Sequence, residues 1–256
     1  MEIKQLPGRQ RIRKGLLLLS FLLFPVTLYY FSPALILQGA SEGVINGSFL
    51  VFTAMFVASL FLGRAWCGWA CPAGALQELA MPVNARRLPR GKVDWIKWAI
   101  WIPWIALIAV LAIGAGGYRS VDPFYQIEGG ATLAIPAGDG PPWWMIYFII
   151  LLLFAGLAVA FGRRAGCRTV CWMAPFMILG RWLRNRAGWP ALRLAAAPDR
   201  CTGCMTCTRA CPMSLDVHAM VKRAAMEDAE CILCGTCVDG CPQQAITYAF
   251  SGRKVR

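Results

Sequence analysis

The stretch that decides the fold is Cys201-Thr-Gly-Cys204-Met-Thr-Cys207-Thr-Arg-Ala-Cys211-Pro212. It returns further along the chain as Cys231-Ile-Leu-Cys234-Gly-Thr-Cys237-Val-Asp-Gly-Cys241-Pro242. Both copies read C-x2-C-x2-C-x3-C-P, and together they hold eight of the twelve cysteines. Four closely spaced thiols, present twice, predict two metal-cluster sites on an internally repeated domain.

This doubled spacing resembles the cysteine runs of bacterial two-cluster ferredoxins, in which the fourth cysteine of one run ligates the cluster of the other run. The resemblance implies two 4Fe–4S clusters. The first would bind Cys201, Cys204, Cys207 and Cys241, and the second would bind Cys211, Cys231, Cys234 and Cys237. Zinc is the alternative occupant, but structural zinc sites pair C-x2-C elements and need neither the third cysteine nor the repeat. A disulfide framework is typical of small extracellular domains, so we expect reduced cysteines that face the cytoplasm.

The rest of the chain is too apolar for a soluble domain, because 58% of the residues are apolar and only 15% are charged. A cleaved signal peptide does not explain the first apolar run, which is long and is followed by three more. The runs predict four membrane spans, at about Gly15–Leu37, Gly47–Ala65, Trp95–Ile113 and Trp143–Phe161. Pro25 and Pro33 predict a kink in the first span.

The fold class is therefore an α-helical integral membrane protein with four transmembrane helices in two repeated hairpins, plus a C-terminal α+β two-cluster ferredoxin-like domain. We expect the membrane domain over residues 1–190 and the ferredoxin domain over residues 191–256. Polar loops are predicted at Gln38–Asn46 and Gly114–Pro142, and short helices at Ala73–Ala80 and Val217–Ala229. An amphipathic helix at Pro175–Arg186 would lie along the membrane surface, with Arg181, Arg184 and Arg186 at the lipid headgroups.

The positive charges predict the orientation. The segment before the first span carries five Lys and Arg residues, the Arg64–Lys97 region six, and everything from Arg163 onward fourteen, whereas the two opposite loops carry only Arg119. Both termini and the ferredoxin domain would therefore be cytoplasmic, in a multi-pass protein of the bacterial inner membrane. Because the net charge of +13 follows this topology, it does not indicate nucleic-acid binding.

A second repeat joins the two halves of the membrane part. The sequence Phe61-Leu-Gly-Arg-Ala-Trp-Cys67-Gly-Trp-Ala-Cys71-Pro72 recurs loosely as Phe161-Gly-Arg-Arg-Ala-Gly-Cys167-Arg-Thr-Val-Cys171-Trp-Met-Ala-Pro175. If the hairpins pack with twofold symmetry, the four cysteines would converge on a third iron–sulfur cluster, a zinc ion or copper. The alternatives are a redox-active or structural thiol pair, or cysteines that only pack.

Other residues limit the function. His218 is the sole histidine, so the spans cannot supply two histidines to a haem, and His218 itself is better explained as a surface residue or a hydrogen-bond donor near a cluster than as a ligand. No G-x-G-x-x-G opens a helix after a strand, which disfavours a nicotinamide site. Six tryptophans near the predicted cytoplasmic boundary indicate an interfacial belt, or else the wall of a quinone pocket: Trp66, Trp69, Trp95, Trp98, Trp172 and Trp182.

Taken together, the four spans, the element Cys67-Gly-Trp-Ala-Cys71-Pro72, the second C-x3-C and the two-cluster tail resemble the membrane polyferredoxins of the NapH, NosR and CcoG type. The resemblance covers nearly the whole chain. It implies electron transfer with the quinone pool and a partner redox subunit, such as an iron–sulfur protein, a cytochrome or a terminal reductase. Trp172 stands where the family has proline after the second C-x3-C, so the chain represents a divergent branch.

Two functions follow. The first is an electron-transfer subunit of a quinol dehydrogenase or respiratory-type complex, which relays electrons between quinone and the partner through the two clusters. The second is a metal-handling or maturation factor that reduces or delivers copper at Cys67, Cys71, Cys167 and Cys171, with the ferredoxin as electron source. The resemblance favours the first, and the sequence identifies no catalytic residue.

Overall fold

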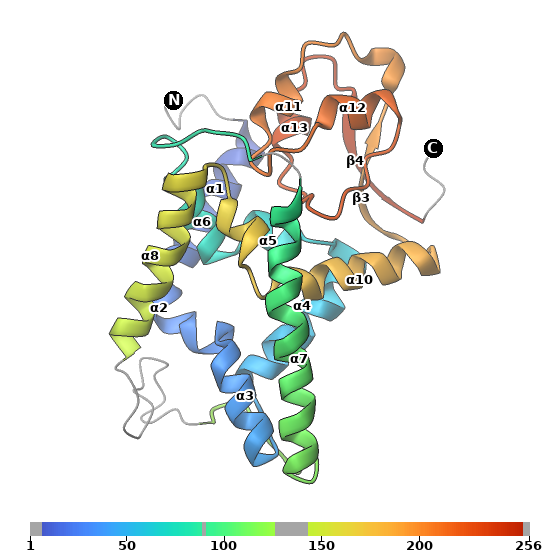
Figure 1. Cartoon of the computed structure of the whole chain (residues 1–256). Helices are drawn as coiled ribbons and strands as arrows, with labels where there is room; N and C mark the ends of the chain where they lie inside the picture. The colour runs from blue at the N-terminus through green and yellow to red at the C-terminus, as the bar shows by residue number, and fades with distance from the viewer. Residues whose placement is uncertain (1–6, 89–90, 126–142, 253–256) are drawn as a thin grey trace.

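The computed structural model describes residues 7–88, 91–125 and 143–252 (Figure 1). The N-terminal apolar region is a broken helix. Helix α1 (Gly8–Leu22) turns by 61° into α2 (Phe24–Thr27) and the 3-10 helix η2 (Leu28–Phe31), and α3 (Pro33–Glu42) follows. The kink predicted from Pro25 and Pro33 is present, since both prolines lie in the first turn of a new helix. The loop predicted at Gln38–Asn46 is wrong in its first half, because α3 continues to Glu42 and ends at Gly43 in the left-handed conformation.

The four predicted spans are only partly found among the described residues. Two helices are long and apolar enough to cross a membrane, at Lys92–Gly114 and Trp144–Phe161, and the broken helix at Gly8–Phe31 would be a third. These correspond to α7 (Ile96–Gly114) with the preceding η3 (Lys92–Trp95), and to α8 (Trp143–Phe161). Helix α4 (Gly47–Leu62) has 16 residues, or about 24 Å, which is shorter than a hydrocarbon layer of about 30 Å. Gly63 ends it with φ +58°, so the predicted span Gly47–Ala65 is too long at its C-terminal end.

The predicted repeat is visible in the order of the helices. Helices α5 (Ala65–Trp69) and α6 (Pro72–Leu79) follow α4, and α9 (Ala165–Thr169) and α10 (Ala174–Ala187) follow α8. The two halves cross over, because α6 packs against α8 and α10 packs against α4 (Figure 1). Helix α9 also contacts α6 of the other half.

The C-terminal part is closed by two antiparallel strands, β3 (Ala191–Ala196) and β4 (Ile246–Ser251), with Ala191 opposite Ser251. Between them lie η4 (Pro198–Arg200), α11 (Thr206–Ala210), α12 (Val217–Lys222) and α13 (Thr236–Asp239). The helix predicted at Val217–Ala229 is shorter than expected, since the backbone at Ala224 turns left-handed and ends it. A second, parallel pair joins β1 (Val44–Asn46) to β2 (Ser120–Asp122). Much of the loop predicted at Gly114–Pro142 lies outside the described residues.

Candidate iron–sulfur centres

The eight cysteines of the doubled run line two cavities. One cavity is bounded by Cys211, Cys231, Cys234 and Cys237, with an apolar wall that includes Met213, Leu215 and Ile232. The other is bounded by Cys201, Cys204, Cys207 and Cys241, together with His218 and Val221. Each predicted ligand set, including the distant fourth cysteine from the other run, therefore surrounds one space.

The backbone of the two loops repeats its least common conformations. Positive φ angles occur at Gly203 and at the equivalent Leu233, at Met205 and Gly235, and at Ser214 and Gln244. Such angles cost non-glycine residues on the order of 1–3 kcal/mol each and gather at functional sites. All eight thiols are free of disulfides. The cavities offer four soft sulfur donors and apolar walls, which is a donor set that fits a 4Fe–4S cluster.

Burial raises the pKa of several of these thiols and so disfavours the thiolate form. It raises the pKa of Cys211 to about 12, with the nearby Cys234 as the next cause. The pKa of Cys237 is raised by burial and by its cysteine neighbours. Exposed Cys204 is the opposite case, because a hydrogen bond with Thr206 lowers its pKa. A bound iron–sulfur cluster would supply the positive charge that thiolates require here.

The four cysteines of the second repeat also come together. All four are buried: Cys67 and Cys167 lie within α5 and α9, Cys71 is the N-cap of α6, and Cys171 follows the end of α9 by two residues. Burial raises the pKa of Cys171 to about 12, and repulsion from Cys167 and Cys67 adds to the effect. Among the described residues, no three His, Cys, Asp or Glu side chains form a metal-ion site.

Two arginines from equivalent positions flank the tetrad. Arg64 and Arg164 each precede the first cysteine of their element by three residues, lie at the N-cap of α5 and α9, and are fully buried. The carboxylate of Glu230 raises the pKa of Arg64 against the effect of burial, and Glu78 does the same for Arg164. Sequence reasoning missed both arginines, although they stand in each copy of the quoted repeat.

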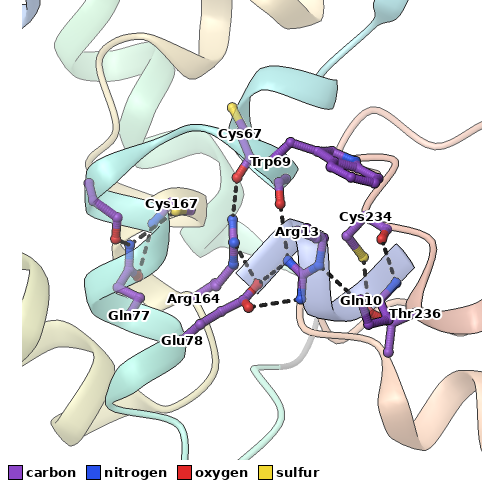
Figure 2. A network of polar contacts seen from close by, with 12 residues as sticks. Gln10, Arg13, Cys67, Trp69, Gln77, Glu78, Arg164, Cys167, Cys234 and Thr236 are labelled. Carbon is purple, nitrogen blue, oxygen red and sulfur yellow. Dashed lines mark hydrogen bonds and ion pairs between the residues drawn. The ribbon is translucent and has the colours of Figure 1, made fainter. Parts of the chain in front are cut away.

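Figure 2 shows how polar contacts surround these thiols. Gln77 Nε2 donates to Cys167 Sγ at 3.0 Å, and Arg164 Nη1 donates to the carbonyl of Cys67 at 2.7 Å. Glu78 accepts from Arg164 Nη2 at 2.6 Å and from Arg13 Nη1 at 2.8 Å. Outside this view, Cys67 Sγ lies 3.5 Å from the thioether sulfur of Met177.

The second cysteine run rests directly on the first C-x3-C element. Trp69 Nε1 donates to the carbonyl of Leu233 at 3.0 Å. Gln10 Nε2 donates to the carbonyl of Cys234 at 3.0 Å (Figure 2). A Cβ atom at Gly68 would collide with the carbonyl oxygen of Ile232. The cavity of the second ligand set is therefore the one that adjoins the membrane part.

Ion pairs hold this junction together. Glu230 pairs with Arg64 at 2.8 Å and also with Lys97, and Glu227 pairs with Arg181 at 2.5 Å. Burial would raise the pKa of both carboxyl groups, but the adjacent cations outweigh it and hold each pKa at about 2. The headgroup positions predicted for Arg181 and Arg184 are wrong, because both side chains are buried against the C-terminal part. Arg186 is exposed and lies over the ring of Trp182.

Two sets of four thiols that each line a cavity, in a chain that also has helices apolar enough to cross a membrane, define a membrane iron–sulfur protein with two 4Fe–4S sites. The 4Fe-4S binding domain family matches residues 47–93, and the 4Fe-4S dicluster domain family matches residues 200–246. The chain is similar in sequence to the polyferredoxins of the NosR and NapH type.

Two relatives define the extent of the similarity. The regulatory protein NosR of Pseudomonas aeruginosa is 27% identical over 72% of this chain, and the matched part is 24% of NosR. The chain thus spans about a quarter of that relative. An uncharacterized protein of Methanocaldococcus jannaschii is 26% identical over 83% of both chains. No solved structure matches the chain.

Proposed function

We propose that the protein relays electrons between the membrane quinone pool and a partner redox protein, as the iron–sulfur subunit of a respiratory-type complex. The observation that carries this proposal is the contact between the two cysteine systems. The loop of Cys234 lies on Gly68 and Trp69, within the same short element that carries Cys67 and Cys71. A quinone at the membrane boundary would thus have a redox group close by.

In this proposal Cys201, Cys204, Cys207 and Cys241 hold one 4Fe–4S cluster, and Cys211, Cys231, Cys234 and Cys237 hold the other. Each cluster supplies one-electron chemistry. The chain keeps water from the second cluster with the apolar wall of its cavity. The same proposal includes a domain boundary at residue 190 and a location in the inner membrane. It also includes the cytoplasmic orientation of both termini, which the basic segments at the predicted cytoplasmic side support.

The tetrad of Cys67, Cys71, Cys167 and Cys171 would hold a third centre between quinone and the second cluster. Its burial, its soft donors and the two flanking arginines suit an anionic iron–sulfur centre. The match of residues 47–93 to a 4Fe-4S binding family supports this assignment.

The test is cluster reduction by quinol. The anaerobically purified protein in lipid vesicles is mixed with a menaquinol or ubiquinol analogue, and the clusters are followed by electron paramagnetic resonance. We expect reduced cluster signals that a quinone-site inhibitor abolishes. The Cys67→Ser/Cys71→Ser variant should keep both ferredoxin clusters but lose reduction by quinol. The relay would be refuted if, with the redox partner present, the cluster signals changed neither with quinol nor with the inhibitor.

A second candidate is the reduction or delivery of copper at the same tetrad. The proximity of Met177 Sδ to Cys67 Sγ favours it, since thioether and thiolate sulfurs select Cu(I). In this case the Cys67→Ser/Cys71→Ser variant would lose reduction of cupric ion while both ferredoxin clusters remain. Equal copper reduction by the wild type and the variant would remove this candidate.

A further inference from the structure

We propose that the exposed loop around Cys204 docks a small redox protein with a carboxylate-rich face, and that the cluster of Cys201, Cys204, Cys207 and Cys241 exchanges electrons with it. The proposal rests on the proposed function in one respect, because it needs the clusters to carry electrons. It adds the order of the clusters and the chemistry of the partner.

The two cluster loops are not equivalent, because one is covered and the other is open. In the second run the carbonyls of Leu233, Cys234 and Cys231 accept hydrogen bonds from Trp69, Gln10 and Arg181 of the membrane part. In the first run the residues from Thr202 to Met205 are exposed, and they include Gly203 and Cys204, which correspond to Leu233 and Cys234. Cys204 is the one cysteine of the twelve in the exposed class. A soluble partner can therefore come closest to the first cluster.

Most acidic side chains near the second cluster are paired with the membrane part or buried. Glu227 and Glu230 pair with cations of the membrane part, and Asp239 pairs with Arg9. Asp228 is buried and accepts the amide of Glu230. The negative charges near the second cluster are thus already compensated within the chain and leave little negative field on the outer side.

The rim of the first cluster is mostly basic. Arg200, Arg209, Lys222 and Arg223 are exposed there, and Arg209 Nη2 donates to the carbonyl of Cys204 at 2.9 Å. Lys222 ends the helix α12, whose residues His218 and Val221 line the cavity of this cluster, and Arg223 follows it.

Two exposed carboxylates, those of Asp199 and Asp216, lie among these cations, and Asp216 caps α12 by accepting the amide of Ala219. The remaining excess of positive charge favours a partner with a negative face. Redox encounters bury little surface, so such long-range attraction contributes strongly to their rates.

The test uses a reduced plant-type 2Fe–2S ferredoxin, an acidic soluble protein, as the probe. One electron leaves the ferredoxin and one enters the oxidised first cluster, with no proton or bond change. Stopped-flow spectroscopy gives the second-order rate constant at several salt concentrations. The variant is Lys222→Glu/Arg223→Glu, and the matched control is Lys14→Glu/Arg186→Glu, which reverses two exposed charges on the membrane part. Arg209 stays unchanged because it supports the Cys204 loop.

We expect the rate constant at low salt to fall at least tenfold in the variant and to stay within twofold in the control. The difference should vanish at 1 M salt, where the Debye length is about 3 Å. Binding of labelled oxidised ferredoxin, measured by fluorescence anisotropy, should weaken in the same variant only. Spin counting checks that all samples contain the same number of clusters per protein molecule.

Three results would overturn the proposal. They are equal rates for the variant and wild type, an equal loss in the control, and an unchanged rate for ferredoxin whose carboxylates have been amidated. The quinol experiment on the same preparations separates this proposal from the relay. If quinol fails to reduce the clusters while the ferredoxin rates behave as expected, the quinone relay is wrong and the docking surface stands.

Discussion

Replacing Glu230 by Gln removes the carboxylate that faces two buried cations at the junction. The side chains of Glu230, Arg64 and Lys97 are 6%, 0% and 1% exposed. Breaking a buried ion pair by removing one partner costs about 3–5 kcal/mol, because the remaining charge stays buried without compensation. The pKa of about 2 for Glu230, against 4.5 for a free glutamate, corresponds to a similar contribution of roughly 3 kcal/mol at neutral pH.

The assay is thermal unfolding in detergent, followed by the visible absorbance of the bound clusters. For a chain of this size the loss corresponds to a fall in Tm of roughly 6–20 °C. Asp199→Asn removes an exposed carboxylate from the same part of the chain and should change Tm by less than about 2 °C. Adding Lys97→Met to Glu230→Gln should recover part of the loss, since one uncompensated cation is removed. A Tm of Glu230→Gln within about 2 °C of the wild type would show that the three charges do not meet in a buried site.

Three further predictions concern neighbouring residues. The folded pKa values of Glu227 and Glu230 lie below the ordinary 4.5, so the stability that the two carboxylates contribute is present above about pH 5 and is lost as the pH falls toward 2. We expect Tm to fall as the pH is lowered across this range. A Tm that does not change with pH would contradict the ion pairs. His218 Nε2 is buried in the cavity of the first cluster and has no hydrogen-bond partner among the described residues. We therefore expect this nitrogen to donate a hydrogen bond to a sulfur of the bound cluster. The His218→Phe variant should lower the reduction potential of that cluster by on the order of 20–60 mV in a redox titration, which is the equivalent of one hydrogen bond to sulfur. An unchanged potential would exclude the bond. Gly68→Val should push the Ile232 loop off the membrane part and slow quinol reduction of the clusters at equal cluster content; an unchanged rate would exclude this contact as the electron route.

The sequence was sufficient for the two repeats, which depend on spacing within short segments, and the resemblance to two-cluster ferredoxins supplied the crossed cysteine sets. The crossed ligand sets line two cavities as predicted, and the C-x3-C elements converge because the halves cross. Ligation of the clusters by these residues stays a prediction.

The charges at the junction could not be assigned from sequence. Arg181 lies in a helix of amphipathic pattern, which predicts lipid headgroups as well as it predicts a protein surface. Its partner Glu227 is 46 residues away, and Arg9 pairs with a residue 230 positions away. The residue pattern of one helix does not predict which carboxylate, distant in the sequence, will pair with an arginine of that helix. The length of α4 was overestimated for a local reason, since Gly63 interrupts an apolar run that hydropathy alone would extend.

The crossing of α6 and α10 bears on how this chain could have arisen. Each half supplies two thiols and a short helix that packs on the opposite half, so one half alone has an incomplete site and an uncovered helix. Two identical copies of a half, related by a twofold axis, would satisfy both requirements. The arrangement is therefore that expected of a duplicated and fused gene whose ancestor worked as a homodimer. A fused pair of halves can differ in sequence, as the two elements do where Pro72 follows Cys71 and Trp172 follows Cys171.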